Sequence, residues 1–472
     1  MEPALGVSNI PTIWVKQLAL LSRRYGWLAL LALAPAFLFF QPGLSPALLV
    51  VPALLALQTI GVEPGAPRTP LDWPLLLLAV MLLVSLWATF SIAYSAAKIA
   101  GLVFGLGLYY ALVAGGRERG RALGVMAALH LALGAGLAAL ALLETKWMDK
   151  FALLSAITAR LPAAAVAVPG AESGLSPNGV AGVLLWTAPP ALALAAGVWL
   201  HFSALARARG RAQAWLAAIG LTVLAVGTSV VLVLTQSRSA LAGLAAGLVA
   251  MPLLTVVFGL WRPARVPARY LWAAVGVALV VALAAGGWLW ARGQARPLAA
   301  AAAFDSAAAL DDGGLAARIL IWPRALAGIE DFPITGMGLY TFQRVANVLY
   351  PPFGLSPDIV LSHAHNTWLQ VALDLGLPGL VAEAAVWLAA AVMLAQTVRR
   401  ARGPGPRALA VGLLGALAGS FVYGLTDTIP LGARPGFLWW MLLALATLVY
   451  LREGQIPQVG NQQSDTGATR VH

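Results

Sequence analysis

Apolar segments long enough to cross the hydrocarbon core of a bilayer recur along almost the whole chain. Twelve such segments are centred in residues 25–42, 44–60, 73–93, 97–114, 121–143, 178–203, 214–235, 239–260, 270–291, 366–397, 406–424 and 433–451. With 60% hydrophobic and 10% charged residues, the chain cannot bury this much apolar surface in one soluble core. The pattern predicts an all-α fold, a polytopic membrane bundle of about twelve transmembrane helices.

Two more polar stretches interrupt this pattern, at 144–177 and 292–365. Since the first apolar run leads directly into further spans, we interpret it as a signal anchor rather than a cleaved signal. We expect an N-terminal five-helix membrane segment (1–143), an external loop (144–177) and a central membrane segment (178–291). These are followed by a large external loop with short amphipathic helices (292–365), a C-terminal three-helix membrane segment (366–452) and a disordered cytoplasmic tail (453–472).

Basic residues indicate how the bundle is oriented. They cluster in alternate loops, near residues 16–24, 68, 117–121, 207–211, 262–269 and 399–407. The positive-inside rule places these loops and both termini in the cytoplasm, and the two polar stretches outside. The formal net charge of +12 therefore has a topological explanation, and no nucleic-acid partner is expected. The absence of cysteine excludes disulfides, thiolate metal sites and a cysteine nucleophile.

Arg238 is the first of three notable polar features. It lies in TQSRSALAG, residues 235–243, inside a long apolar run. An arginine near the membrane is unfavourable unless it pairs or reaches the interface, so it indicates a functional site. The alternative is that Arg238 marks a tight turn between two helices.

The second feature lies in the large external loop, at residues 317–342. Apolar residues at near-helical spacing predict an amphipathic helix on the membrane surface, namely Ile319, Leu320, Trp322, Leu326 and Ile329. Arg318 and Arg324 lie on or near its polar side, where they would contact either lipid headgroups or a substrate.

The third feature is SHAHNTWLQVALDLGLPG, residues 362–379, where His363 and His365 precede a predicted helix. A histidine there serves either as a general base or as a structural residue, and Asn366 is placed to cap the helix. Two histidines could also hold a metal, but the loop offers no third ligand at a suitable spacing, so neither metal nor cofactor is expected.

The glycines of the same segment affect which backbone conformations it can adopt. Gly376 and Gly379 flank Pro378, and this combination permits close helix packing or a kink within the span.

Together these stretches resemble the bacterial O-antigen ligase and O-antigen polymerase superfamily. AHNTWLQVALDLGLPG fits that superfamily's pattern of histidine, a polar residue, nine residues, glycine, two residues and glycine. TQSRSALAG is similar to its arginine motif, although Leu241 stands one residue earlier than in the commonest ligase pattern. The external segment after Arg318, the Pro-Asn helix start at Asn178 and the late Asp427 are similar as well, so the resemblance spans about residues 170–450.

The resemblance implies a fold of the membrane glycosyltransferase C type and a bacterial inner-membrane location with the site facing the periplasm. It implies metal-independent, inverting transfer of a glycan from undecaprenyl diphosphate to a lipid A-core, polysaccharide or protein acceptor. On this basis His365 is the expected base, and Arg238 and Arg318 hold the diphosphate. The expected substrate-binding residues are Lys98, Asn366, Arg324, Asn178, Asp427 and His363.

Two other functions fit parts of the pattern. A transporter or flippase of lipid-linked oligosaccharide would also need many helices and buried cations, but it would more naturally show an internal repeat. A non-catalytic assembly scaffold would give no reason for the position of Arg238. Within glycan transfer, the complete histidine pattern favours a ligase over a polymerase.

Overall fold

The computed structural model describes residues 10–39, 41–60, 69–118, 122–162, 164–166, 168–169, 171–257, 315–351 and 363–454. The predicted span at 270–291, much of the predicted loop 292–365 and the tail beyond residue 454 lie outside the described residues.

The described chain is helical, which confirms the predicted all-α class. Its elements are α1 (Ile10–Leu38), η1 (Pro42–Leu49), α2 (Val50–Thr59), α3 (Asp72–Ala88), α4 (Ile92–Glu118), α5 (Ala122–Glu144), α6 (Ala152–Thr158), α7 (Pro177–Leu184), α8 (Ala188–Leu200), α9 (Phe202–Arg209), α10 (Arg211–Leu234), α11 (Arg238–Val257), α15 (Leu315–Asp331), α16 (Phe342–Leu349), α17 (Thr367–Arg400), α18 (Pro404–Gly424), η2 (Arg434–Gly436) and α19 (Phe437–Gly454). In these residues the β-type pairing is confined to an isolated bridge between Thr145 and Leu175.

Eight helical stretches of the described chain are long and apolar enough to cross a membrane: Ile92–Arg117, Ala122–Glu144, Pro177–Leu200, Arg211–Leu234, Arg238–Thr255, Thr367–Arg400, Pro404–Gly424 and Arg434–Gly454. The predicted spans at 25–42, 44–60 and 73–93 fall on α1, on η1 with α2, and on α3. The protein is thus a multi-pass membrane protein, while the total of about twelve spans stays a prediction.

Glycines allow α11 and α18 to pack with their backbones close together. A Cβ atom at Gly243 would lie 2.5 Å from the carbonyl oxygen of Gly419, and one at Gly247 would lie 2.7 Å from that of Gly415. Small residues at such spacing are typical of close helix pairs in membranes. The contact brings the start of α11 beside the end of α18, where Thr426 and Ser239 share a hydrogen bond of 2.9 Å between their hydroxyls.

The predicted span at 366–397 is not one continuous helix, because α17 folds back on itself at Gly376. This residue has φ +70° and ψ 179°, outside the helical region. The ring centroids of Trp368 and Trp387 are 5.6 Å apart. In a straight helix, residues 19 positions apart would be separated by ~28 Å. The short first part of α17 therefore runs back along the part that follows Gly376.

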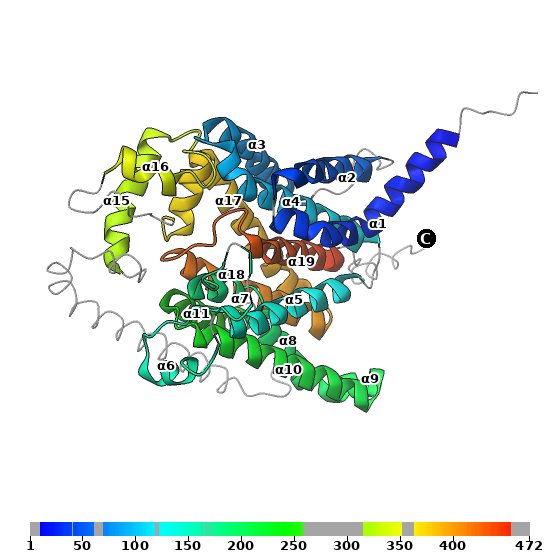
Figure 1. Cartoon of the computed structure of the whole chain (residues 1–472). Helices are drawn as coiled ribbons and strands as arrows, with labels where there is room; N and C mark the ends of the chain where they lie inside the picture. The colour runs from blue at the N-terminus through cyan, green and yellow to red at the C-terminus, as the bar shows by residue number, and fades with distance from the viewer. Residues whose placement is uncertain are drawn as a thin grey trace, which may run out of the picture.

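The segment after α15 is fastened to this fold. The N–H of Met337 donates to the carbonyl of Leu373, and the N–H of Leu377 donates to that of Pro333, both at 2.7 Å. Figure 1 shows α6, α15 and α16 at one end of the bundle and α9 at the opposite end. We call the first of these the α15 end, and it is where the polar residues of interest gather.

Candidate active site

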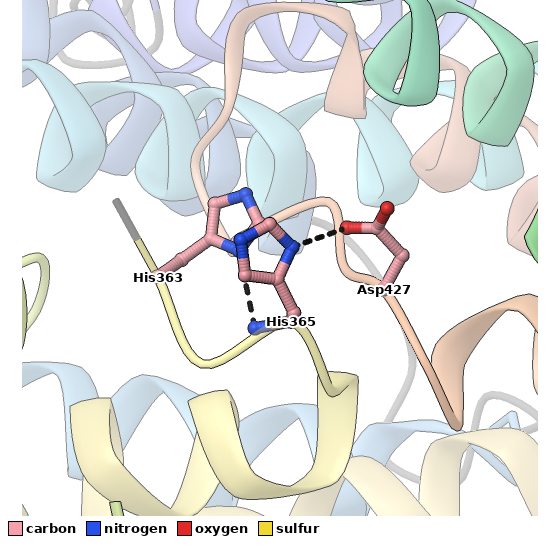
Figure 2. Close-up of side chains that lie close together, drawn as sticks. All are labelled: His363, His365 and Asp427. Carbon is pink, nitrogen blue, oxygen red and sulfur yellow. Dashed lines mark hydrogen bonds and ion pairs between the residues drawn. The ribbon is translucent and has the colours of Figure 1, made fainter. Parts of the chain in front are cut away.

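His363, His365 and Asp427 come together at the α15 end (Figure 2). The histidines lie in the turn that precedes α17, and Asp427 lies in the loop after α18. His365 Nδ1 is 3.2 Å from Asp427 Oδ1, which also accepts the N–H of Thr428 at 2.9 Å. Asp427 is only 1% exposed, so its carboxylate is withdrawn from water and held by these donors.

Local backbone chemistry fixes the histidine turn. Asn366 caps α17, because its side-chain oxygen accepts the N–H groups of Trp368 at 2.9 Å and Leu369 at 3.1 Å. Its side-chain N–H donates to the carbonyl of Leu425 at 3.0 Å, which joins the turn to the end of α18. His365 has φ +48°, a left-handed conformation that is unusual for a residue with a side chain and indicates a tightly determined position.

Arg318, in the first turns of α15, approaches the same carboxylate. Its Nη2 is 4.0 Å from Asp427 Oδ2. Burial lowers the pKa of Arg318. The nearby Asp427 and Tyr423 act to raise this pKa, whereas the positive charge of Arg238 lowers it further. Arg238, the first residue of α11, is therefore near enough to Arg318 for their charges to repel. Arg318 Nε is buried and makes no hydrogen bond within the described part of the chain.

The surroundings of His363 and Asp427 lower the pKa of both groups. Burial lowers the pKa of His363 to about 3. The charges of His365, Lys98 and Arg318 also lower it, whereas the charge of Asp427 acts to raise it. Burial acts to raise the pKa of Asp427, but its hydrogen bond to His365 and the charges of both histidines outweigh burial and lower that pKa. His363 is thus neutral near pH 7, and its Nδ1 accepts the N–H of His365 at 3.2 Å.

Lys98, in the second turn of α4, is a further cation near the histidines. Its Nζ is 4.9 Å from the ring centroid of Tyr340, in cation–π geometry. Since its charge also contributes to the low pKa of His363, it belongs to the same cationic surroundings as Arg318.

Two other residues that the sequence singled out have structural partners. The carbonyl of Asn178, at the start of α7, accepts the Tyr423 hydroxyl at 3.0 Å. The Nε of Arg324 donates to the carbonyl of Tyr350 at 2.8 Å, which fastens α15 to the end of α16.

The same cluster has the composition of a metal site. The sequence offered no third ligand near the histidines, but the fold supplies Asp427, and the potential ligand atoms of the three residues lie within 4.8 Å of one another. Within this group, His365 Nδ1 and Asp427 Oδ1 are hydrogen-bonded to each other. The nearby charges of Arg318 and Lys98 disfavour a divalent cation and favour an anionic ligand.

A cavity adjoins the cluster, and Thr367 and Thr428 line it on that side. It is walled by four tryptophans, namely Trp387 from α17, Trp439 and Trp440 from α19, and Trp186 from the turn after α7. Glu383 also lines it and accepts the Trp387 indole N–H at 2.9 Å. The cavity gives the site a largely apolar neighbour inside the bundle.

Sequence analysis named Trp322 only as part of an apolar helix face, and it missed Gln370 and Asp374, which also support the histidine turn. Gln370 and Asp374 are 3% and 1% exposed within an apolar helix. Polar side chains in a membrane segment are unfavourable unless they are bonded, so their presence in the segment after the histidines was an available signal.

Comparison with known proteins finds a match to one family model. A family model described as O-antigen ligase matches residues 223–384. This match supports the O-antigen ligase and polymerase superfamily that the sequence motifs indicated. The match supports a glycosyltransferase-like activity of the O-antigen ligase or polymerase type. The matched segment contains Arg238, Arg318 and His365, whereas Lys98 and Asp427 lie outside it. No match emerges from the curated proteins.

Proposed function

We propose that this O-antigen ligase-type protein transfers an oligo- or polysaccharide from undecaprenyl diphosphate to an acceptor at the periplasmic face of a bacterial inner membrane. The observation that carries the proposal is the contact of His365 Nδ1 with Asp427, 3.2 Å long, beside Arg318. A base held by a carboxylate, next to cations, suits the attack of a hydroxyl on a sugar diphosphate.

His365 acts as the general base in this proposal. Its Nδ1–H donates to Asp427, and this assigns Nε2 as the nitrogen that takes the proton of the acceptor. The acceptor oxygen forms a bond to the anomeric carbon while the bond from that carbon to the diphosphate oxygen breaks. Attack from the side opposite the diphosphate inverts the anomeric centre, and undecaprenyl diphosphate leaves with the electron pair.

Arg238 and Arg318 hold the diphosphate, with Lys98 as a third cation. Guanidinium groups offer several donors in a planar arrangement that matches phosphate oxygens. The buried Nε of Arg318 is one donor that such a ligand would satisfy. Because these cations neutralise the leaving group, the reaction needs no metal ion, and transfer should persist in excess EDTA.

The aromatic cavity beside Thr367 and Thr428 suits the apolar chain that carries the diphosphate. His363, Asn366, Asn178 and Arg324 then support the site through their hydrogen bonds, without touching the reacting atoms. For the acceptor we favour a lipid A-core, as in a ligase, over a growing polysaccharide, because the family model that matches carries the ligase description.

Reconstitution tests the proposal. Purified protein in vesicles would receive a labelled carrier-linked oligosaccharide and, separately, lipid A-core, polysaccharide and protein acceptors. We expect transfer by the wild type and losses of at least about 100-fold for His365→Ala and Arg238→Ala, the size of general-base and electrostatic contributions. His201→Ala and Arg207→Ala change exposed residues at the opposite end and serve as matched controls.

Two outcomes would contradict the proposed glycan transfer. Full transfer by both site variants would remove the catalytic assignment. Movement of the labelled lipid-linked sugar across the vesicle membrane without any transfer would support a transporter instead.

A further inference from the structure

Ala364, the residue between the two histidines, is held on both sides of its backbone. It is completely buried. Its N–H donates to Gln370 Oε1 at 2.8 Å, and its carbonyl accepts the indole N–H of Trp322 at 3.0 Å. Both backbone groups of this residue are thus satisfied by side chains, one from α17 and one from α15, and neither side chain belongs to the reacting cluster.

Gln370 is oriented in turn by Asp374, one helical turn further along α17. The amide nitrogen of Gln370 donates to Asp374 Oδ1 at 3.0 Å. The same oxygen accepts the backbone N–H of Tyr340 at 3.1 Å. Asp374 is 1% exposed, so the two hydrogen bonds form in a site from which water is excluded and where their geometry is strongly preferred.

Tyr340 extends this chain of contacts to Lys98. It has φ +63°, a conformation that its hydrogen bond to Asp374 helps to hold. One face of the site is completed by the Tyr340 ring, which stacks on Tyr94 with centroids 5.0 Å apart and lies 4.9 Å from Lys98 Nζ. A continuous series of bonded groups therefore joins the position of a cation to that of the histidines.

We propose that Gln370, Asp374 and Trp322 are positioning residues that hold the histidine turn in register with the cationic side of the site. They act through Ala364 and Tyr340 and do not touch the substrate. His365 takes its left-handed backbone conformation immediately after the residue that Gln370 and Trp322 clamp. Release of either bond lets the turn relax and moves the imidazole away from Asp427. This inference rests on the function proposed above.

Three variants separate the bonds involved. Trp322→Phe removes only the indole N–H and keeps an aromatic ring in the same place. Gln370→Met removes the amide and keeps a similar shape. Gln370→Glu keeps an oxygen acceptor for Ala364 and, by sharing a proton with Asp374, the second bond as well. Trp147→Phe is the matched control, since it removes an indole N–H that donates to the carbonyl of Pro162 at 3.1 Å and takes no part in the clamp on Ala364.

The measurement is kcat and KM for the carrier-linked donor in reconstituted vesicles, per folded protein judged by gel filtration in detergent. We expect Trp322→Phe and Gln370→Met to lower kcat at least tenfold with KM changed by less than about twofold, because the cations that bind the donor stay in place. Gln370→Glu should recover part of kcat, and Trp147→Phe should match the wild type.

The inference is overturned if Trp322→Phe and Gln370→Met keep kcat within about twofold of the wild type. It is also overturned if their only effect is a smaller folded fraction with normal kcat per folded molecule. If Gln370→Met does not fold, Trp322→Phe decides the question alone. His365→Ala is run in parallel: its full activity would refute the proposed function, whereas its inactivity beside active Trp322 and Gln370 variants would refute only the positioning role.

Discussion

Asp427 lies where the histidine turn, α15 and the end of α18 meet. Its two oxygens face different partners, His365 on one and Arg318 on the other. A buried carboxylate in this position sets the tautomer of the imidazole and compensates the charge of the guanidinium, so one substitution affects both.

We expect Asp427→Asn to lower kcat by roughly 100-fold, because an amide neither stabilises the imidazolium formed during proton transfer nor compensates Arg318. Initial rates with saturating donor would measure this. Asp331→Asn is the control, since its exposed carboxylate accepts only the Tyr350 hydroxyl at 2.6 Å among the described contacts. A variant with a normal rate would show that Asp427 plays no part in proton transfer.

His363 gives the site a pH dependence of stability. Its pKa is about 3 in the folded protein, against the ordinary histidine value of 6.5, so the unfolded chain binds the extra proton more readily. The free energy of unfolding should be unaffected by this group above pH 6.5 and should fall as the pH decreases from about 6.5 toward 3. Replacement by Asn removes the titrating group. The thermal unfolding temperature in detergent should therefore decline less steeply from pH 7 to pH 4 in His363→Asn than in the wild type, and equal slopes would contradict the assignment.

Single residues could be predicted from the sequence where they broke the apolar pattern. Arg238, Arg318 and His365 stood out because charged or titratable groups are rare in such a chain, and Asp427 was found through the family resemblance. The clamp on Ala364 could not be predicted, since it depends on a hydrogen bond from the Trp322 indole to the Ala364 carbonyl, 42 residues later in the chain. No local pattern records which indole N–H will meet which carbonyl.

At the scale of elements, the fold at Gly376 does most to shape the site. The kink that the sequence permitted is present, but it is a reversal and not a bend, so the predicted span 366–397 divides into two helical parts. Hydropathy could not separate them, because both parts are apolar and the short first part packs inside the bundle. The reversal follows from tertiary contacts with residues 333–337, which a period of 3.6 does not report.

We predict that Gly376→Ala destabilises the protein and lowers activity. A Cβ atom there would lie 2.2 Å from the carbonyl oxygen of Ile334, and the φ of +70° is itself unfavourable for alanine by about 1–3 kcal/mol. Gly220→Ala in α10 is the matched control, since a Cβ atom there meets nothing within 4 Å and alanine favours the helix by about 1 kcal/mol. Thermal unfolding in detergent would compare them, and an unchanged midpoint for Gly376→Ala would contradict the backbone constraint.

At the scale of the whole molecule, the absence of cysteine permits a direct test of orientation. Glu330→Cys places a thiol at an exposed position near the end of α15, and Arg207→Cys places one at an exposed position of α9, at the opposite end (Figure 1). We expect an impermeant maleimide to label only the first in intact spheroplasts and both after lysis. Labelling of Arg207→Cys alone in intact cells would reverse the proposed orientation.

The arrangement of α17 also sets how deep the chemistry lies. Trp368, next to the histidine turn, lies eight residues before Gly376, so the start of α17 sits ~12 Å along the first arm from the point of reversal. The number of residues in each helical part of α17 thus sets how far the histidine turn lies from Gly376. One helical turn added to both arms would move the histidines by ~5 Å relative to the reversal, and away from the depth at which α11 presents Arg238. The length of this hairpin is therefore matched to the register of the helices that carry the arginines.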